Sequence, residues 1–332
     1  MKLNLGIKQF RIAIFIIIAT ATFELGHAQK KSEEKIIDQW FLSTGDWEND
    51  PQIYVREVGT GTEPVIMLHG GWGAEHSGLV EAISGLKDEF RFIFYEQRGS
   101  LRSPFPDSLI SFEEHIKDLE LLRVELNLDK MTIIGHSMGA VLASAYASKY
   151  PEHVKKLVLM SPAQLKEPFP EEDKEIQHQQ FLANKKFQNR IEIIQELEKY
   201  NLNRADSLLN SRERTIKSRI NFGKLMLYDI TKWTQLDNGK ALYKGKVYDL
   251  TAKTYPEKGW NYFLEFNKHT YPISIIIGDH DWLDFGNGLY KKWTKEVPRI
   301  KMTSIKNAGH MPWIEQPKEV TKALRISLNL KR

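Results

Sequence analysis

The stretch that decides the fold is Gly135-His136-Ser137-Met138-Gly139. It follows an apolar run at 131–134 and leads into a helix-like run at 140–147. A serine with a glycine two positions away on each side, between a strand and a helix, is typical of the sharp turn that presents a nucleophile. The glycines are needed because side chains at their positions would collide with the neighbouring strand and helix. The serine oxygen then lies at the positive end of the helix, where a developing anion is stabilised.

Apolar runs alternate with helix-like segments on both sides of this turn. Runs without polar interruptions are typical of strands that are buried on both faces of a parallel sheet. Ser111, followed by Glu114, is a capping box that predicts the start of one helix. Strands are expected at 52–58, 64–68, 91–95, 131–134, 156–160, 273–277 and 300–305, and helices at 77–87, 111–126, 140–150, 288–297 and 317–330. The sequence therefore predicts an α/β fold with a mostly parallel, doubly wound sheet.

The alternation is interrupted in the middle of the chain. Between residues 163 and 267 the sequence contains charged, helix-prone runs and then an aromatic-rich stretch. We predict that this segment is a helical cap, inserted into a core formed by 29–162 and 268–332. The aromatic residues have two interpretations, the cap's own core or the walls of a substrate pocket. The candidates for pocket walls are Trp233 and Trp260.

Two polar residues follow later strands, at the positions that a serine nucleophile requires. The active sites of open α/β sheets lie at the carboxyl ends of the strands. Asp281 follows the strand expected at 273–277, and His310 follows the strand expected at 300–305. A histidine can accept the proton of Ser137, and a carboxylate fixes the tautomer of that histidine. The sequence therefore predicts a catalytic triad in the chain order serine, aspartate, histidine.

Several further motifs carry a family resemblance. They are His69-Gly70-Gly71, Gln97-Arg98-Gly99 with Ser103, the segment 118–123, Gly278-x-x-Asp281 and Gly309-His310. With these motifs and the triad, the chain resembles the α/β-hydrolase superfamily over essentially everything after residue 28. Within that superfamily it is most similar to the proline iminopeptidase group of serine aminopeptidases. The family pattern places the acid at the fourth residue of the G-x-x-D turn, which selects Asp281 over Asp279.

The chain departs from the proline iminopeptidase pattern at four positions. That family usually has a tryptophan after the nucleophile and a proline after the paired glycines, where this chain has Met138 and Trp72. Glu96 replaces an aspartate before the Gln-Arg-Gly motif, and Leu101 replaces a second glycine. The turn G-H-S-M-G is closer to those of esterases and lipases with the same fold. The resemblance therefore implies a superfamily, while the aminopeptidase activity is one alternative within it.

The expected chemistry assigns a role to each site residue. Ser137 attacks a carbonyl carbon, His310 acts as general base and then as acid, and Asp281 orients the histidine. The backbone N–H groups of Met138 and Gly71 are the expected oxyanion donors. Trp72, beside that loop, is a candidate wall of the substrate pocket. No metal or other cofactor is expected, because the histidines have none of the spacings typical of zinc sites.

An aminopeptidase must also bind the terminal ammonium group of its substrate, which requires a carboxylate near the acyl pocket. In the family that the chain resembles, the cap supplies it. The alternative interpretation is that these carboxylates are solvated charges on the exposed faces of helices. The candidates in this cap are Glu171, Glu172, Asp229 and Asp237.

Three functions follow as hypotheses. The first is a serine hydrolase that removes N-terminal residues from short peptides, and the second is a carboxylesterase for small acyl esters. The third is an inactive hydrolase scaffold that serves as a binding protein, against which the intact triad argues. The expected partner in the first two cases is a small molecule or a short peptide. A serine nucleophile, in place of an aspartate, argues against dehalogenases and epoxide hydrolases.

The N-terminal segment predicts export. Lys2, Lys8 and Arg11 precede an apolar run at 12–22 that is too short to span a bilayer with ease, and small residues then lead to a cleavage site before Gln29. We therefore expect a cleaved signal peptide at 1–28, a periplasmic or secreted enzyme, and no stable membrane association after cleavage. A retained membrane anchor is the alternative.

Composition adds two limits to the possible functions. The chain has 332 residues and no cysteine, which excludes disulfides, thiol catalysis and thiolate metal sites. The formal net charge is +4, of which the first 28 residues carry +2, so the remainder gives no electrostatic reason to expect nucleic acid as a partner.

Overall fold

The computed structural model describes residues 38–236 and 242–329. From Gln39 onward these residues belong to one compact unit. The signal peptide expected at 1–28 lies outside the described residues. Within the described ranges, no helix is both long enough and apolar enough to cross a membrane.

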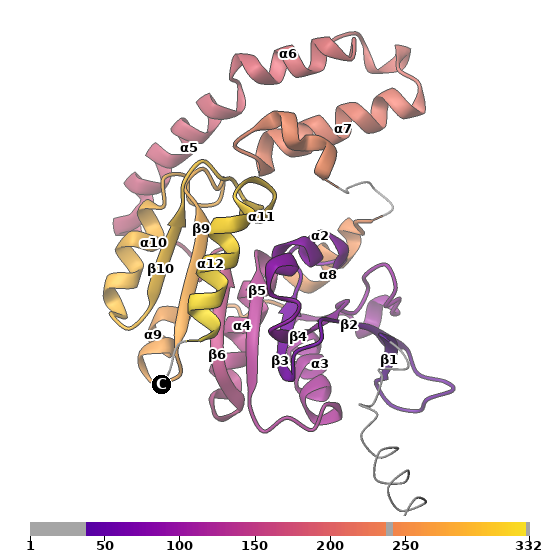
Figure 1. Cartoon of the computed structure of the whole chain (residues 1–332), viewed down its shortest axis with the longest axis vertical. Coiled ribbons are helices and arrows are strands. Elements are labelled where there is room, and N and C mark those ends of the chain that lie inside the picture. Colours follow the sequence, from indigo (N-terminus) through magenta and orange to yellow (C-terminus); the bar gives the residue numbers. More distant parts are fainter. Residues whose placement is uncertain (1–37, 237–241, 330–332) are drawn as a thin grey trace, which may run out of the picture. The chain divides into compact units, whose positions relative to one another are not determined.

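The centre of the unit is an eight-stranded sheet with the strand order β1-β2-β4-β3-β5-β6-β9-β10 (Figure 1). From β4 to β10 neighbouring strands pair in parallel, whereas β2 runs antiparallel to both β1 and β4. The strands are β1 (Gln39–Ser43), β2 (Gln52–Val58), β3 (Glu63–Leu68), β4 (Phe90–Tyr95), β5 (Met131–His136), β6 (Val154–Met160), β9 (Ile273–Gly278) and β10 (Lys301–Ile305). The prediction of a mostly parallel α/β sheet is confirmed. The edge strand β1 was not expected, because its short apolar run becomes a strand only by pairing with β2.

Helices cover both faces of this sheet, which explains why its strands are apolar throughout. Along β3, Ile66 and Leu68 pack into the apolar cluster on one face, while Val65 and Met67 pack into the cluster on the other. The first face carries α3 (Phe112–Glu125), α4 (Met138–Lys149), α9 (Tyr262–Asn267) and α10 (Gly288–Trp293), and the second carries α2 (Ser77–Val80), η1 (Glu81–Leu86), α11 (Pro312–Glu315) and α12 (Pro317–Leu328).

Two helix starts test the local predictions. The hydroxyl of Ser111 accepts a hydrogen bond from Glu114 N at 3.2 Å, so the predicted N-cap of α3 is present. The helix expected at 77–87 is instead a single α-helical turn, α2, followed by the 3-10 helix η1. Gly78 and Gly85 lie within this segment, and glycine lowers the stability of an α-helix.

The insertion between β6 and β9 has its own apolar cluster. Its main helices α5 (Lys174–Gln188), α6 (Ile191–Lys199), α7 (Ser211–Met226) and η6 (Ile230–Gln235) are followed by α8 (Gly245–Ala252). Ile193, Ile220 and Ile230 belong to a cluster separate from those of the sheet. Val247 of α8 and Phe263 of α9 pack into the cluster of the sheet instead. By packing, the segment expected as a cap thus divides into an outer part, α5 to η6, and helices that join the main body.

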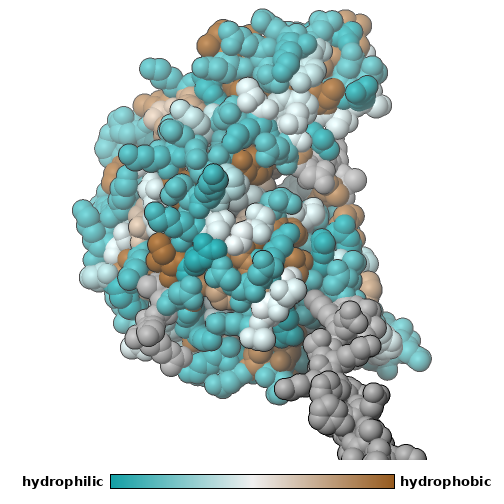
Figure 2. Space-filling view, viewed as in Figure 1, coloured by the Kyte–Doolittle hydropathy of each residue, from teal (hydrophilic) through white to brown (hydrophobic). Residues whose placement is uncertain are grey.

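The outer part of the insertion, α5 to η6, will be called the cap. In Figure 1, α5 leads away from the sheet, and α6 and α7 form the far end of the cap. Figure 2 shows that polar residues dominate this face of the cap, with apolar residues scattered between them, and that the surface is hollowed beneath it. The cap is therefore an addition to the sheet with its own small interior.

The turn between β5 and α4 depends on two glycines. A Cβ atom on Gly139 would lie 2.4 Å from the carbonyl oxygen of Leu68 and 2.6 Å from that of His69. A Cβ atom on Gly135 would lie 2.4 Å from the carbonyl oxygen of Gly139. Backbone oxygens cannot move away as flexible side chains do, so both positions exclude any side chain. The steric role predicted for these glycines is therefore confirmed.

We expect the substitution Gly139→Ala to destabilise the protein by about 3 kcal/mol or more, because the new methyl group overlaps two backbone carbonyls. Urea unfolding followed by circular dichroism measures the effect. Gly78→Ala is the matched control, since its Cβ would come no nearer than 3.6 Å to a neighbour, the flexible end of Met311. Equal stability of the two variants would contradict the packing described for this turn.

Candidate active site

Ser137 occupies the turn between β5 and α4 in a strained conformation. Its φ is 54° and its ψ is −119°, a region that non-glycine residues rarely adopt. The backbone is fixed on both sides: Ser137 N donates to Met160 O at 3.1 Å, and Ser137 O accepts from Ala163 N at 3.1 Å. The hydroxyl does not cap α4, although Ser137 stands at its N-cap position. The half-buried side chain is thus left available for chemistry.

His310 and Asp281 form a hydrogen-bonded pair. The Nδ1 atom of His310 lies 3.0 Å from Oδ1 and 2.9 Å from Oδ2 of Asp281. Both side chains are enclosed, with 3% and 0% of their surface exposed. Leu283 N donates to Asp281 Oδ1 at 3.0 Å and so fixes the carboxylate. Because the carboxylate accepts the Nδ1 proton, the other ring nitrogen, Nε2, is left as the acceptor.

Asp279, the other aspartate of this loop, has a different partner. Its Oδ1 atom lies 2.6 Å from Nδ1 of the adjacent His280 and 3.4 Å from Ala308 N. The ring of His280 packs against Phe187 and Tyr228 of the cap, with ring centroids 5.0 and 4.6 Å away. Asp279 and His280 therefore belong to the packing between this loop and the cap.

His136, next to the nucleophile, connects the end of β5 to the histidine loop. Its Nε2 atom donates to the carbonyl oxygen of His310 at 3.1 Å, and the two rings lie 4.8 Å apart. On its other side it contacts the ring of Trp313 at 4.8 Å. Burial lowers the pKa of His136, so the ring is neutral at neutral pH. His136 therefore connects the residue before Ser137 to the backbone of His310 without adding a charge.

The first loop, after β3, touches the nucleophile directly. A Cβ atom on Gly70 would lie 2.6 Å from Cβ of Ser137, so the two backbones are in close contact. Gly71 follows with a φ of +72°, which favours glycine. Met138 is the first residue of α4, where N–H groups have no partner within the helix. The two expected oxyanion donors, Gly71 and Met138, thus belong to segments that meet at Ser137; their role stays a prediction.

His69 and Gln97 hold this loop in place. Gln97 N donates to Nε2 of His69 at 3.1 Å, and the Gln97 amide donates to His69 O at 2.9 Å. Burial lowers the pKa of His69, so the neutral ring can accept a hydrogen bond. Arg98 binds Asp118 through two hydrogen bonds, of 2.7 and 2.5 Å. These contacts give structural roles to the motif residues on which the family resemblance rests.

The three tryptophans expected in the substrate pocket have structural partners. Trp72 is 0% exposed; it donates to Tyr255 OH at 2.5 Å and stacks on His115 at 4.7 Å. Trp233 is buried in the cluster of the cap and donates to Glu196 at 2.7 Å. Trp260 is half-buried and donates to the carbonyl oxygen of Gln164. The burial of Trp72 and Trp233 gives no support to the expectation that their rings form pocket walls.

Tyr243 is a candidate that the sequence did not single out. A Cβ atom on Gly71 would lie 3.7 Å from its ring, and 46% of the Tyr243 surface is exposed. The next residue, Lys244, donates from its backbone N–H to Gly73 O at 2.9 Å. Tyr243 therefore stands over the expected oxyanion loop. No local motif marks it, since tertiary packing alone brings α8 to this loop.

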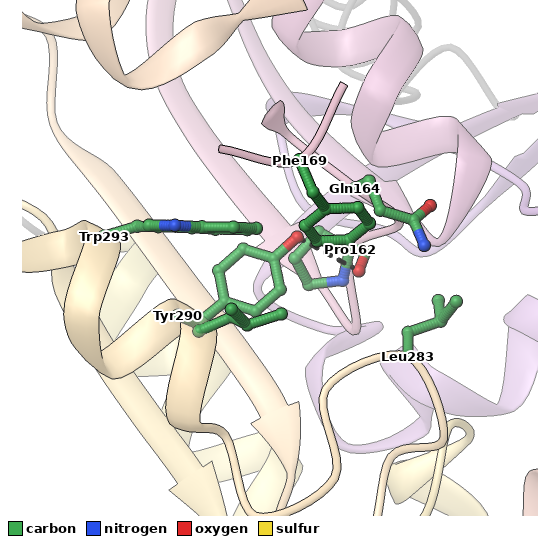
Figure 3. Close-up of a pocket in the computed structure, with 7 residues that line it drawn as sticks. Pro162, Gln164, Phe169, Leu283, Tyr290 and Trp293 are labelled. Atoms are coloured by element: carbon green, nitrogen blue, oxygen red, sulfur yellow. Dashed lines mark hydrogen bonds between the residues drawn. The ribbon is translucent and has the colours of Figure 1, made fainter. Parts of the chain in front are cut away.

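A small apolar pocket lies between the segment that follows β6, the loop that carries Leu283 and the helix α10 (Figure 3). It is lined by Pro162, Gln164, Phe169, Leu283, Leu289, Tyr290 and Trp293. The Tyr290 hydroxyl donates to Ala163 O at 2.7 Å, which fixes the loop after β6. That loop also binds Ser137, and Leu283 binds Asp281, so the pocket is built on the same two loops as the site. Its lining is mostly apolar, but the space is narrower than a water molecule, so these residues form packing between the two loops.

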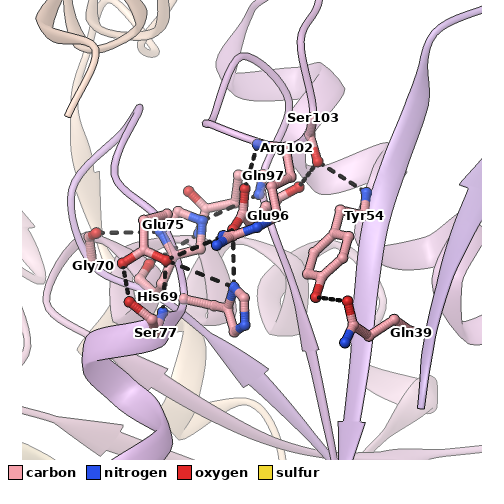
Figure 4. A network of polar contacts seen from close by, with 11 residues as sticks. Gln39, Tyr54, His69, Gly70, Glu75, Ser77, Glu96, Gln97, Arg102 and Ser103 are labelled. Carbon is pink, nitrogen blue, oxygen red and sulfur yellow. Dashed lines mark hydrogen bonds and ion pairs between the residues drawn. The ribbon is translucent and has the colours of Figure 1, made fainter. Parts of the chain in front are cut away.

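One group of carboxylates and histidine among the described residues has the spacing of metal ligands: Glu75, His76 and Glu96 (Figure 4). His76 Nδ1 lies 2.9 Å from Glu96 Oε1. The guanidinium of Arg102 lies 2.5 Å from the same oxygen and 3.4 Å from Glu75. The positive charge that a metal ion would bring is therefore already supplied by Arg102. This group fits an ion-pair network that fixes the loop after β4 better than it fits a metal site.

A strained serine turn and a paired histidine and aspartate, all at the carboxyl edge of a doubly wound sheet, are the arrangement typical of the α/β-hydrolase fold. The chain belongs to the alpha/beta hydrolase fold family, whose model matches residues 63–317. A proline iminopeptidase of Heyndrickxia coagulans is 26% identical over 284 residues, which cover 82% of this chain and 92% of that protein. The resemblance to this family and to proline iminopeptidases is thus confirmed.

Two further comparisons are more limited. A proline iminopeptidase of Lactobacillus helveticus is 40% identical over 118 residues, 33% of this chain and 40% of that protein. The match therefore spans less than half the length of this relative. Naproxen esterase from Bacillus subtilis has a similar structure, with a TM-score of 0.58 and 18% identity over 88% of this chain and 91% of that one. At this identity the likeness shows the fold alone.

We expect Asp281→Asn to lower hydrolytic activity by roughly 10⁴-fold, because the amide would hold His310 in the wrong tautomer. Steady-state kinetics on a chromogenic ester measure the effect. Asp279→Asn is the matched control and should change the rate by less than about tenfold, since that carboxylate contacts His280 and not His310. The reverse ranking would show that Asp279 is the acid of the site.

Proposed function

We propose that the protein is a serine hydrolase that acts through an acyl-enzyme and removes N-terminal residues from short peptides. The observation that carries the proposal is the pair of hydrogen bonds from His310 to Asp281, together with the strained and uncapped Ser137, whose neighbour His136 contacts His310. The choice of peptides is supported by relatives named proline iminopeptidase, one of which aligns over most of both chains.

In the first half of the proposed reaction, His310 Nε2 takes the hydroxyl proton of Ser137 as the oxygen attacks the carbonyl carbon. The oxyanion that forms is stabilised by the N–H groups of Met138 and Gly71; loss of one such donor typically lowers the rate about 100- to 1000-fold. The imidazolium is stabilised by Asp281 and then gives its proton to the departing amine or alcohol. An ester between Ser137 and the acyl group remains.

In the second half, a water molecule takes the place of the leaving group. His310 removes a proton from this water, and the hydroxide attacks the acyl carbon of the ester. Collapse of the second oxyanion breaks the bond to Ser137, and the serine oxygen takes the proton back from His310. The products are a free acid and a regenerated serine, so the cycle needs no cofactor.

The carboxylates that could bind a free amine differ in their surroundings. Glu171 pairs with Lys174, and the carboxylate of Asp229 accepts from Thr231. Glu172 is exposed, and Asp237 lies outside the described residues. Among the described candidates, two thus have other partners and the third is solvated. An aminopeptidase would use Asp237, or one of the described carboxylates after a change of partner.

A carboxylesterase is the second candidate, and the sequence of the nucleophile turn favours it. With Met138 after the serine, this turn resembles those of esterases. An inactive binding protein is a third hypothesis. The presence of Ser137, Asp281 and His310 in the chain order of a triad argues against it.

Export is part of the proposal. Its support is the pattern of residues 1–28, in which a basic start precedes an apolar run and small residues. We propose a periplasmic or secreted enzyme whose mature chain begins at Gln29.

The proposed function is tested by comparing three chromogenic substrates: a prolyl or alanyl amide with a free amine, the same amide with its amine blocked, and a short p-nitrophenyl ester. An aminopeptidase should cleave the free-amine amide at least about 100-fold faster than the blocked one, because its carboxylate binds the ammonium. Rapid cleavage of the ester, with no preference for the free amine, would support the esterase instead.

Labelling by an organophosphonate provides the control for this comparison. The wild-type protein should be labelled at Ser137 and the variant Ser137→Ala should not. If both proteins are labelled equally, or if neither is labelled, the protein is not a serine hydrolase that uses Ser137. The hypothesis of an inactive binding protein would then remain.

The export proposal has a separate test. Full-length protein expressed in a Gram-negative host should appear in the periplasmic fraction or the medium, with an N-terminus at Gln29 when the intact mass is measured. A membrane-bound protein of unreduced mass would contradict cleavage and support the retained anchor.

A further inference from the structure

We propose that Glu315 is a positioning residue that fastens the catalytic histidine loop to the cap, so that the triad has its active geometry only while the cap is seated. The proposal rests on the proposed function in one respect, the role of His310 as the general base. Its structural part, a joint between two segments far apart in the sequence, stands on contacts alone.

The carboxylate of Glu315 binds three backbone N–H groups from two segments. Its Oε2 atom accepts from Gly309 N at 2.6 Å and from Tyr228 N at 3.1 Å. Its Oε1 atom accepts from Asp229 N at 2.7 Å. Gly309 immediately precedes the catalytic histidine, while Tyr228 and Asp229 form the turn between α7 and η6 of the cap. The side chain is buried, with the residue only 6% exposed.

Other contacts at the same place strengthen the joint. His310 N donates to Met226 O at 2.8 Å, and a Cβ atom on Gly309 would lie 2.3 Å from that oxygen. In the opposite direction, Lys232 of η6 donates from Nζ to Glu315 O at 3.0 Å. The backbone of His310 is therefore bound on its N–H side by the cap and on its carbonyl side by His136 of β5.

This arrangement requires a carboxylate in the ionised form. Both of its oxygens accept, whereas an amide has one acceptor oxygen and an NH₂ group that would face the N–H of Asp229 or Gly309. A buried N–H left without a partner is destabilising by roughly 1–3 kcal/mol. Burial raises the pKa of Glu315, whereas its three backbone N–H donors and the charge of Lys232 favour the ionised form. Arg190, also in the cap, adds positive charge nearby. Glutamine at 315 should therefore weaken the joint without removing side-chain volume.

The consequence is a mechanical link between the cap and the chemistry. The last turn of α7 and the start of η6 cannot move away from the sheet without pulling on Gly309 and His310. A displacement of about 1 Å of a catalytic group is enough to lower a rate by roughly 100-fold. A substrate that holds the cap against the main body would thereby also hold His310 in the active geometry of the triad.

The first test compares Glu315→Gln with Glu319→Gln, a matched control on the exposed face of α12. We expect Glu315→Gln to lower kcat by about 100-fold on a small p-nitrophenyl ester, with KM changed less than threefold, because the histidine and not the binding pocket is displaced. Glu319→Gln should keep the wild-type kcat. An unchanged kcat in Glu315→Gln, or a change in KM alone, would overturn the proposal.

The second test removes a donor on the cap side and leaves Glu315 unchanged. It therefore also applies if Glu315→Gln does not fold. Asp229→Pro removes the N–H that donates to Glu315, at a position whose φ of −94° is near the proline range. Asp229→Ala removes the same side chain but keeps that N–H. The proline variant should have a kcat at least tenfold below that of the alanine variant. Equal kcat values would show that the cap does not position His310.

Hydrogen–deuterium exchange tests the joint independently of catalysis. In Glu315→Gln, or in Asp229→Pro measured against Asp229→Ala, exchange should rise together in peptides covering 226–231 and 308–311, and remain unchanged in α12. A rise in only one of the two segments would contradict the link. If labelling at Ser137 has failed, the proposed function is wrong, and a joint rise in exchange would still establish the link between cap and loop.

Discussion

The close approach of two backbones at the turn between β5 and α4 is the constraint on which the rest of the structure depends. Gly139 lies against the carbonyl oxygens of Leu68 and His69, at a distance that no Cβ atom permits. This contact brings the helix that follows the nucleophile onto the end of β3, so that the loop after β3 touches Ser137 through Gly70. The strained backbone of Ser137 is possible because apolar packing on both faces of the sheet fixes the two elements that it joins. Local strain at the site is thus maintained by burial elsewhere.

Neutral histidines form much of the scaffold around the site. His69 receives a hydrogen bond from the loop after β4, and His136 donates one to the backbone of His310. His115 supports Trp72 by stacking, and burial lowers its pKa to about 3. Burial lowers the pKa of His69 and His136 as well. A neutral imidazole can donate on one nitrogen and accept on the other, which allows it to connect loops without adding charge next to a developing oxyanion.

The cap is connected to this scaffold at more than one place. Phe187 of α5 and Tyr228, after α7, pack on His280, which lies between Asp279 and Asp281. Glu315 and Met226 connect the same end of the cap to Gly309 and His310. The loops that follow β9 and β10 therefore both have contacts to one turn of the cap. The apolar cluster of the cap also packs against Met311 and Ile314, which follow His310 in the chain.

Residue order alone predicts the sheet and the nucleophile turn, and it places a candidate serine, aspartate and histidine in the chain order of a triad. These features rest on local physics: apolar runs for strands buried on both faces, and small residues where backbones touch. Long-range packing shows that His310 pairs with Asp281 and not Asp279, that Trp72 and Trp233 are buried, and that Tyr243 lies over the loop after β3. It also assigned Glu315, which has no motif, to both the cap and the histidine loop. These roles depend on which backbone groups a side chain contacts across long separations in sequence. Residue type and periodicity do not encode such long-range contacts.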